Sequence, residues 1–80
     1  MEIKQQVRAF VTSNFYVADP PGLDDDASLL DRGIIDSTGV LEVIGFIEDT
    51  FGITVEDSEM LPENLDSITR IANFIARKKE

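Results

Sequence analysis

Residues 37–51, STGVLEVIGFIEDTF, constrain the fold most strongly, because their apolar side chains recur every three or four positions. That spacing places them on one side of a helix, whereas a half-buried strand would need strict alternation. Acidic residues fall between the apolar ones, and Gly52 follows as a suitable C-cap. The segment therefore predicts an amphipathic helix that begins at Ser37. Asp36 or Ser37 would accept a hydrogen bond from a free amide of its first turn.

Two further segments have apolar residues at helical spacing. The first covers residues 2–15, and the second begins near Asp66 or Ser67 and runs toward the basic C-terminus. Positive charge there suits the negative end of a helix dipole. A short turn is expected over residues 57–61, because Pro62 follows it. Helices of this length need mutual packing, so we expect an all-α fold, a small antiparallel four-helix bundle of three longer helices and one short one.

The connection between the first two helices is long and contains Pro20, Pro21 and Gly22, which end the first helix. Loops of this length are uncommon in a compact domain. Its apolar residues therefore indicate that this long first loop is held against the core. They are Leu23, Leu29, Leu30, Ile34 and Ile35.

The chain has 80 residues, of which 42% are hydrophobic, and this favours one small domain over residues 1–80. No apolar run approaches the roughly 20 residues of a membrane span. The N-terminus, MEIKQQVRAF, lacks the basic region and apolar core of a secretory signal. We therefore expect a cytoplasmic protein without a membrane span, and a monomer.

The net charge of −9 comes from the middle of the chain. Residues 33–69 contain nine acidic residues and no basic one, while acids and bases balance in the rest. Such a surface repels nucleic acid phosphates and attracts basic protein patches, so we expect protein partners and no nucleic acid. An acidic surface also serves solubility, and charge alone does not separate the two roles.

The residue types present exclude several kinds of reactive site. The absence of histidine and cysteine rules out Ser-His-Asp and Cys-His sites and disulfides, and argues against a zinc site. The run Asp24–Asp26 lacks the further ligands and the glycine of a calcium loop, so we interpret it as a surface loop and predict no metal site. The chain is therefore not expected to be an enzyme. If Ser37 reacts, another protein must supply the catalytic groups.

Asp-Ser occurs at residues 36–37, 57–58 and 66–67, and each pair alone suits an N-cap. Only the first pair follows LLDRGII and precedes a long amphipathic helix. Its next residues, Thr38 and Gly39, are small and are expected to keep the surroundings of Ser37 open. A phosphodiester built on the Ser37 hydroxyl would lie near the positive end of the helix dipole.

The segment LLDRGIIDSTGVLEVIGFIEDTFGI resembles the attachment segment of acyl and peptidyl carrier proteins, and the similar layout extends over nearly the whole chain. The resemblance implies that Ser37 receives 4′-phosphopantetheine from coenzyme A. The thiol of this arm would carry an acyl or aminoacyl thioester between partner enzymes. The resemblance also implies that Asp36 helps to orient coenzyme A and its metal ion in the complex with a phosphopantetheinyl transferase.

The same resemblance implies a partner-binding surface on the helix after Ser37, where the acids match the acidic recognition helix of the family. The residues concerned are Thr38, Leu41, Glu42, Gly45, Glu48 and Asp49. Two of them depart from the commonest family pattern. Thr38 stands where leucine is usual, and Gly45 stands where a larger apolar residue contacts partners. A third departure is Gly33, which lies four residues before Ser37 instead of three.

The form GIIDSTG looks more like discrete carriers that work with adenylating ligases, such as the D-alanyl carrier family, than like the general fatty-acid carrier. The implied partners are acyl- or aminoacyl-adenylating ligases or synthases with basic docking patches. The implied pathways are fatty acid, polyketide, nonribosomal peptide or related biosynthesis. Two other hypotheses are an unmodified acidic helical adaptor that binds a basic surface, and a small metal-binding protein that uses the aspartate-rich loop. The first leaves the GIIDSTG layout as coincidence, and the second lacks a ligand pattern.

Overall fold

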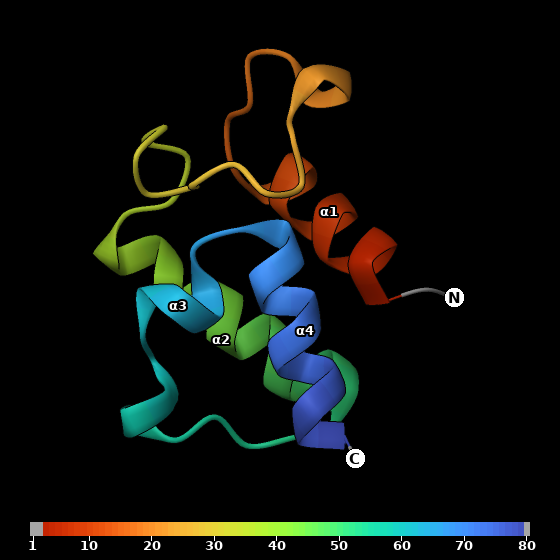
Figure 1. Cartoon of the computed structure of the whole chain (residues 1–80), viewed down its shortest axis with the longest axis vertical. Helices are drawn as coiled ribbons and strands as arrows, with labels where there is room; N and C mark the ends of the chain where they lie inside the picture. Colours follow the sequence, from red (N-terminus) through yellow and green to blue (C-terminus); the bar gives the residue numbers. More distant parts are fainter. Residues whose placement is uncertain (1–2, 80) are drawn as a thin grey trace.

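The computed structural model describes residues 3–79, which form helices, turns and loops and no strand. The helices are α1 (Ile3–Asn14), α2 (Ser37–Phe51), α3 (Pro62–Leu65) and α4 (Ile68–Lys79). Two 3₁₀ turns cover Pro20–Gly22 and Asp57–Glu59. An all-α bundle of three longer helices and one short helix is thereby confirmed (Figure 1). No helix in this part of the chain is long and apolar enough to cross a membrane.

Helix α4 lies in the middle of the bundle, and both α1 and α3 pack against it (Figure 1). All three longer helices contribute to one apolar core. Its fully buried helical side chains are Val7, Val11, Val43, Ile47, Ile68, Ile71, Phe74 and Ile75. Each such side chain stabilises the fold by about 1.5–3 kcal/mol relative to an exposed one. Burial therefore stabilises helices that are too short to persist alone in water.

Half-buried phenylalanines join α1 to α2. The rings of Phe10 and Phe46 are stacked with their centroids 4.2 Å apart. Phe46 in turn meets Phe51 edge-on at 5.8 Å, and Phe10 meets Phe15 in the same way at 5.8 Å. Offset stacked and edge-on pairs stabilise a fold beyond the area that they bury.

The long first loop is held against the core, as its apolar residues predict. Leu23, Leu29 and Ile35 are buried, and Ile34 packs partly against them. The expectation for Leu30 was wrong, because 39% of this residue is exposed. Leu29 turns into the core, and its neighbour Leu30 is held at the surface by its own amide, which donates to the Asp66 carboxylate.

Asp66 connects the first loop to the junction between α3 and α4. Its carboxylate accepts from the Ser28 hydroxyl at 2.7 Å and from the Leu30 amide at 3.0 Å. Its backbone carbonyl accepts from the Leu29 amide at 2.8 Å. One residue therefore holds three consecutive residues of the loop.

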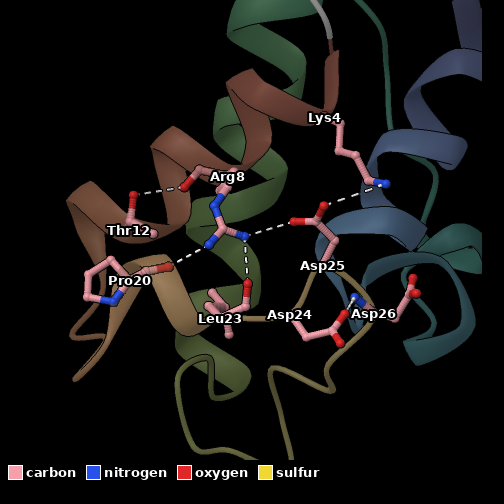
Figure 2. Close-up of polar contacts among 8 residues, drawn as sticks. All are labelled: Lys4, Arg8, Thr12, Pro20, Leu23, Asp24, Asp25 and Asp26. Atoms are coloured by element: carbon pink, nitrogen blue, oxygen red, sulfur yellow. Dashed lines mark hydrogen bonds and ion pairs between the residues drawn. The ribbon is translucent and has the colours of Figure 1, made fainter.

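Arg8 connects the same loop to α1 (Figure 2). Its guanidinium donates to the carbonyls of Leu23 and Pro20 and to the Asp25 carboxylate. Lys4 lies 3.6 Å from the other oxygen of Asp25. The aspartate run thus has a structural role, and no cluster of three potential metal-ligating side chains exists within residues 3–79.

The ends of α2 agree with the sequence. Asp36 is the N-cap, and its Oδ1 accepts from the Gly39 amide at 2.7 Å. Gly52 is the C-cap in a left-handed conformation, with φ of 68°, which a residue without a Cβ adopts at little cost.

Other boundaries differ from the expected ones. Residue 2, included in the predicted first helix, lies outside the described residues, and α1 ends at Asn14. Pro62 was expected to end an element but begins α3, because the first position of a helix needs no amide donor. The turn before it covers only Asp57–Glu59, and it is capped by Glu56 and Glu59 instead of by the Asp-Ser pair within it. Helix α4 begins at Ile68, and the Ser67 hydroxyl accepts from the Arg70 amide at 3.0 Å.

Gly45 lies in the interior of α2, where no atom lies within 4 Å of the place that a Cβ would take. Glycine inside a helix costs about 1 kcal/mol relative to alanine. We therefore expect Gly45→Ala to raise the free energy of unfolding by about 1 kcal/mol in urea titrations. Gly39→Ala is the matched comparison, because its new Cβ would lie 2.9 Å from Cε1 of Phe15. If both substitutions raised the free energy of unfolding equally, the space around each glycine would not explain the effect.

Candidate functional site

Ser37 is the first residue of α2 and is exposed. Because Asp36 provides the cap, the Ser37 hydroxyl is not needed to satisfy the first turn, and it has no hydrogen-bond partner within residues 3–79. The unpaired amides of a helix N-terminus create a positive electrostatic potential. The structure therefore presents a free hydroxyl at the positive end of a 15-residue helix.

The backbone just before Ser37 is fixed. The amides of Ile34 and Ile35 both donate to the Leu29 carbonyl, at 3.0 and 3.3 Å. Gly33 adopts a left-handed conformation, with φ of 70°, and its amide donates to the Leu30 carbonyl. Since Ile35 is buried, the chain enters α2 from a position that is anchored in the core.

Gly39 has a different role from the expected one. It was predicted to keep the surroundings of Ser37 open, but it is buried. A Cβ at this position would lie 2.9 Å from Phe15 and 3.3 Å from Ile35. The missing side chain therefore provides room for a close contact with the segment that follows α1, while Thr38 is exposed as expected.

An apolar cleft of about 230 Å³ opens beside Ser37. Ser37 is the one polar residue among those that line it, and the others are Leu30, Val40, Met60, Leu61, Pro62 and Leu65. Leu30 and Leu61 are 39% and 41% exposed, although apolar side chains of this size are usually buried. Sequence reasoning missed these two residues as part of the site. No local pattern distinguishes them, because the neighbours Ile34 and Ile35 both pack against the core whereas Leu30 does not follow Leu29 into it.

The wall of this cleft formed by residues 60–62 is connected to the end of α4 by polar contacts. The Glu59 carboxylate accepts from the Lys78 ammonium at 2.9 Å and from the Glu56 amide at 2.9 Å. Asn64 continues these contacts, donating to the Glu59 carbonyl and accepting from Arg77. These polar contacts near the surface therefore fix residues 60–62 in addition to the packing of the apolar core.

The Glu56 amide and then the Lys78 ammonium lower the pKa of Glu59 below its ordinary value of 4.5. A lowered folded-state pKa stabilises the fold above the unfolded value, and this stabilisation is lost as the pH falls through the folded value. Glu59→Gln should therefore be less stable than the parent near neutral pH, with a difference that shrinks below pH 4.5. Urea unfolding over a pH series measures this difference in the free energy of unfolding, and Glu63→Gln, a substitution of an exposed acid, is the control. A difference independent of pH would contradict the assignment.

Most of the predicted partner-binding residues lie along one side of α2. Thr38, Glu42, Gly45 and Asp49 follow each other at spacings of three or four residues, which aligns them along the helix. Thr38, Glu42 and Asp49 are exposed, and Gly45 is half-buried.

The other two predicted partner-binding residues differ from each other. Leu41 is 64% exposed and lies one turn after Ser37. Glu48 is half-buried, and its Oε2 accepts from the Val55 amide at 2.9 Å, so its carboxylate holds the segment after α2.

Comparison with known proteins identifies the family of the chain. Residues 5–75 match the family model described as the phosphopantetheine attachment site. The chain is 33% identical over 75 residues to the acyl carrier protein of Campylobacter hominis, which covers 94% of this chain and 91% of the relative. It is 29% identical over 55 residues to the D-alanyl carrier protein of Abiotrophia defectiva, or 69% of this chain and 70% of the relative. It is 39% identical over 50 residues to the D-alanyl carrier protein of Streptococcus pyogenes serotype M5, or 62% of this chain and 63% of the relative.

The family match and the relatives indicate a non-catalytic carrier with a covalently attached phosphopantetheine group. The residues of α2 fit such a group, because an exposed hydroxyl without a partner stands at a helix N-terminus that suits a phosphodiester. The match over residues 5–75, together with a relative that aligns over nearly its whole length, shows that this chain belongs to the family of phosphopantetheine-bearing carrier proteins.

Proposed function

We propose that this carrier protein bears its 4′-phosphopantetheine arm on Ser37 and delivers an acyl or aminoacyl group between partner enzymes. The observation that carries the proposal is the free Ser37 hydroxyl, which the neighbouring Asp36 cap leaves available. When bound, the arm supplies a thiol that holds the cargo as a thioester. The chain itself supplies a fixed attachment point and a weakly binding acidic surface, so residues 1–80 act as one carrier domain.

Asp36 has a second role in this proposal. Its Oδ1 is engaged by the Gly39 amide, whereas Oδ2 has no partner within the described residues. Asp36 is exposed next to the hydroxyl that reacts. We propose that this carboxylate helps to orient coenzyme A and its metal ion in the transferase complex.

We propose that an acyl- or aminoacyl-adenylating ligase, or a synthase, loads the arm in fatty acid, polyketide, nonribosomal peptide or related biosynthesis. Similarity to D-alanyl carrier proteins supports an aminoacyl cargo. The apolar cleft beside Ser37 supports an acyl chain instead, because its lining offers no polar group except the serine. A mass spectrum of the protein purified from its own host would distinguish these two cargo classes.

Incubation with coenzyme A and a broad-specificity phosphopantetheinyl transferase tests the attachment directly. Intact mass spectrometry should show a gain of one arm per chain, because one serine has the required placement. A carrier protein already known to be modified serves as the control for transferase activity. An unchanged mass beside an active control would favour the unmodified acidic adaptor.

The acidic side of α2 should make loading depend on salt, because attraction between exposed charges weakens as ionic strength rises. Neutralising Glu42 and Asp49 together, by Glu42→Gln and Asp49→Asn, should lower kcat/KM of the transferase about three- to tenfold at low salt, as expected for two solvent-exposed charge pairs. The salt dependence should decrease in the same variant. Glu63→Gln, an exposed acid on α3, is the matched control. Loading that does not respond to ionic strength would contradict docking through this side of the helix.

A further inference from the structure

Basic side chains are few in this protein, and nearly all of them have a contact within residues 3–79. Six of the seven are engaged, by a carboxylate, a carbonyl, an amide oxygen or an aromatic ring: Lys4, Arg8, Arg70, Arg77, Lys78 and Lys79. The seventh, Arg32, is exposed, and its guanidinium has no hydrogen-bond or ion-pair partner among the described residues. Its charge is therefore available to another molecule.

Arg32 lies in the first loop, five residues before Ser37, and its amide donates to the Ser28 carbonyl at 3.1 Å. It lines a hollow of about 300 Å³ together with Tyr16 and Asp19. Tyr16 is 84% exposed, more than any other large hydrophobic side chain among residues 3–79. Arginine and tyrosine are enriched among the residues that dominate binding energy at protein interfaces. An unpaired arginine and an exposed tyrosine beside a hollow therefore indicate a contact surface.

Acidic residues lie on both sides of Ser37 in the chain, and Arg32 is the one basic residue between Arg8 and Arg70. Glu42 and Asp49 follow the serine on α2, whereas Arg32 precedes it. A partner that was basic over its whole docking surface would be attracted by α2 and repelled by Arg32. Charges of both signs, in contrast, fix the orientation in which two proteins meet.

We propose that Arg32, together with Tyr16, binds an aspartate or glutamate side chain of the phosphopantetheinyl transferase, an inference that rests on the proposed function. The planar guanidinium pairs with a carboxylate through two parallel hydrogen bonds. The enzyme would present basic residues to α2 and an acidic residue to the first loop. Arg32 thus determines the direction of docking, and the acids of α2 supply the attraction.

A phosphate of coenzyme A is the other anion that could meet Arg32. One observation favours the carboxylate. The hollow at Arg32 shares no lining residue with the cleft that contains Ser37.

Kinetics of arm transfer with the transferase of the same host test the proposal. An acidic residue of the enzyme at Arg32 and a uniformly basic docking surface predict changes in KM of opposite sign when Arg32 becomes acidic. Arg32→Glu should raise KM for the carrier about tenfold at low salt and leave kcat nearly unchanged, and Arg32→Gln should raise KM less. Arg70→Glu, an exposed substitution on α4, is the matched control and should not change KM. An unchanged or lower KM for Arg32→Glu would overturn the proposal, because a uniformly basic partner surface favours added negative charge.

A binding measurement without coenzyme A distinguishes a carboxylate of the transferase from a phosphate of coenzyme A as the ligand of Arg32. Calorimetry of Ser37→Ala with the transferase, in the absence of coenzyme A, should show weaker binding when Arg32→Glu is added. A loss of affinity that appears only with coenzyme A present would assign the contact to a phosphate and overturn the proposal. Failure of the proposed function is distinguishable, since the unmodified parent chain would then gain no arm at all. Thermal unfolding of Arg32→Glu should match the parent, because the guanidinium has no partner to lose among residues 3–79.

Discussion

Ser37→Ala is expected to abolish the gain of mass on incubation with coenzyme A and a phosphopantetheinyl transferase. Its hydroxyl is exposed at the start of α2 and has no partner in the described part of the chain, and no other serine has the same surroundings. The fold should tolerate the change, because Asp36 caps the helix and a surface substitution of this kind usually changes stability by less than about 0.5 kcal/mol. Intact mass measures the modification, and circular dichroism checks the fold.

Ser58→Ala is the matched control, because Ser58 also follows an aspartate, is exposed and begins no long helix. It should gain one arm, as the parent chain does. Ser67 suits this purpose less well, since it is 2% exposed and its hydroxyl caps α4. A Ser37→Ala protein that still gained an arm would show that the attachment point lies elsewhere.

Asp66→Ala is expected to cause the largest loss of stability among the polar substitutions considered. The change removes the charged acceptor of two hydrogen bonds, from the Ser28 hydroxyl and the Leu30 amide. Hydrogen bonds to charged groups contribute about 1.5–3 kcal/mol each, and the partly exposed donors recover some of this from water, so we expect a loss of about 2–3 kcal/mol. Urea unfolding monitored by circular dichroism measures it.

Two further measurements relate this loss to the first loop. Hydrogen exchange at the Leu30 amide should accelerate in Asp66→Ala, because that amide loses its acceptor. Asp26→Ala is the control, since its exposed side chain has no contact within the described residues and its removal should leave the midpoint of unfolding unchanged. Equal midpoints for the two variants would show that the Asp66 contacts contribute no net stability.

The parts of the fold that the sequence predicted are those encoded locally. The start of α2 at Ser37 and its end before the C-cap Gly52 follow from a capping residue, an apolar period and a glycine, all within one segment. The sequence left open whether Asp36 or Ser37 caps the helix, and the structure shows that Asp36 does, which leaves the Ser37 hydroxyl free.

The parts that the sequence did not reveal depend on residues far apart in the chain. The Asp66 carboxylate binds Leu30 and Ser28, which precede it in the chain by 36 and 38 positions. Arg8 binds Asp25, which follows it by 17 positions. No local pattern indicates such pairs. For the same reason the apolar cleft could not be predicted, since its lining residues come from the first loop, α2 and the segment before α4.

Tyr16 is the only tyrosine of the chain, which contains no tryptophan. Because this ring stands 84% exposed at the surface and outside the core, unfolding changes its environment little, and its ultraviolet emission is a poor reporter of the folded state. The same position makes it a natural optical label for the first loop. Energy transfer from Tyr16 to a tryptophan of a docked enzyme would record an encounter in real time, without any dye attached to the carrier.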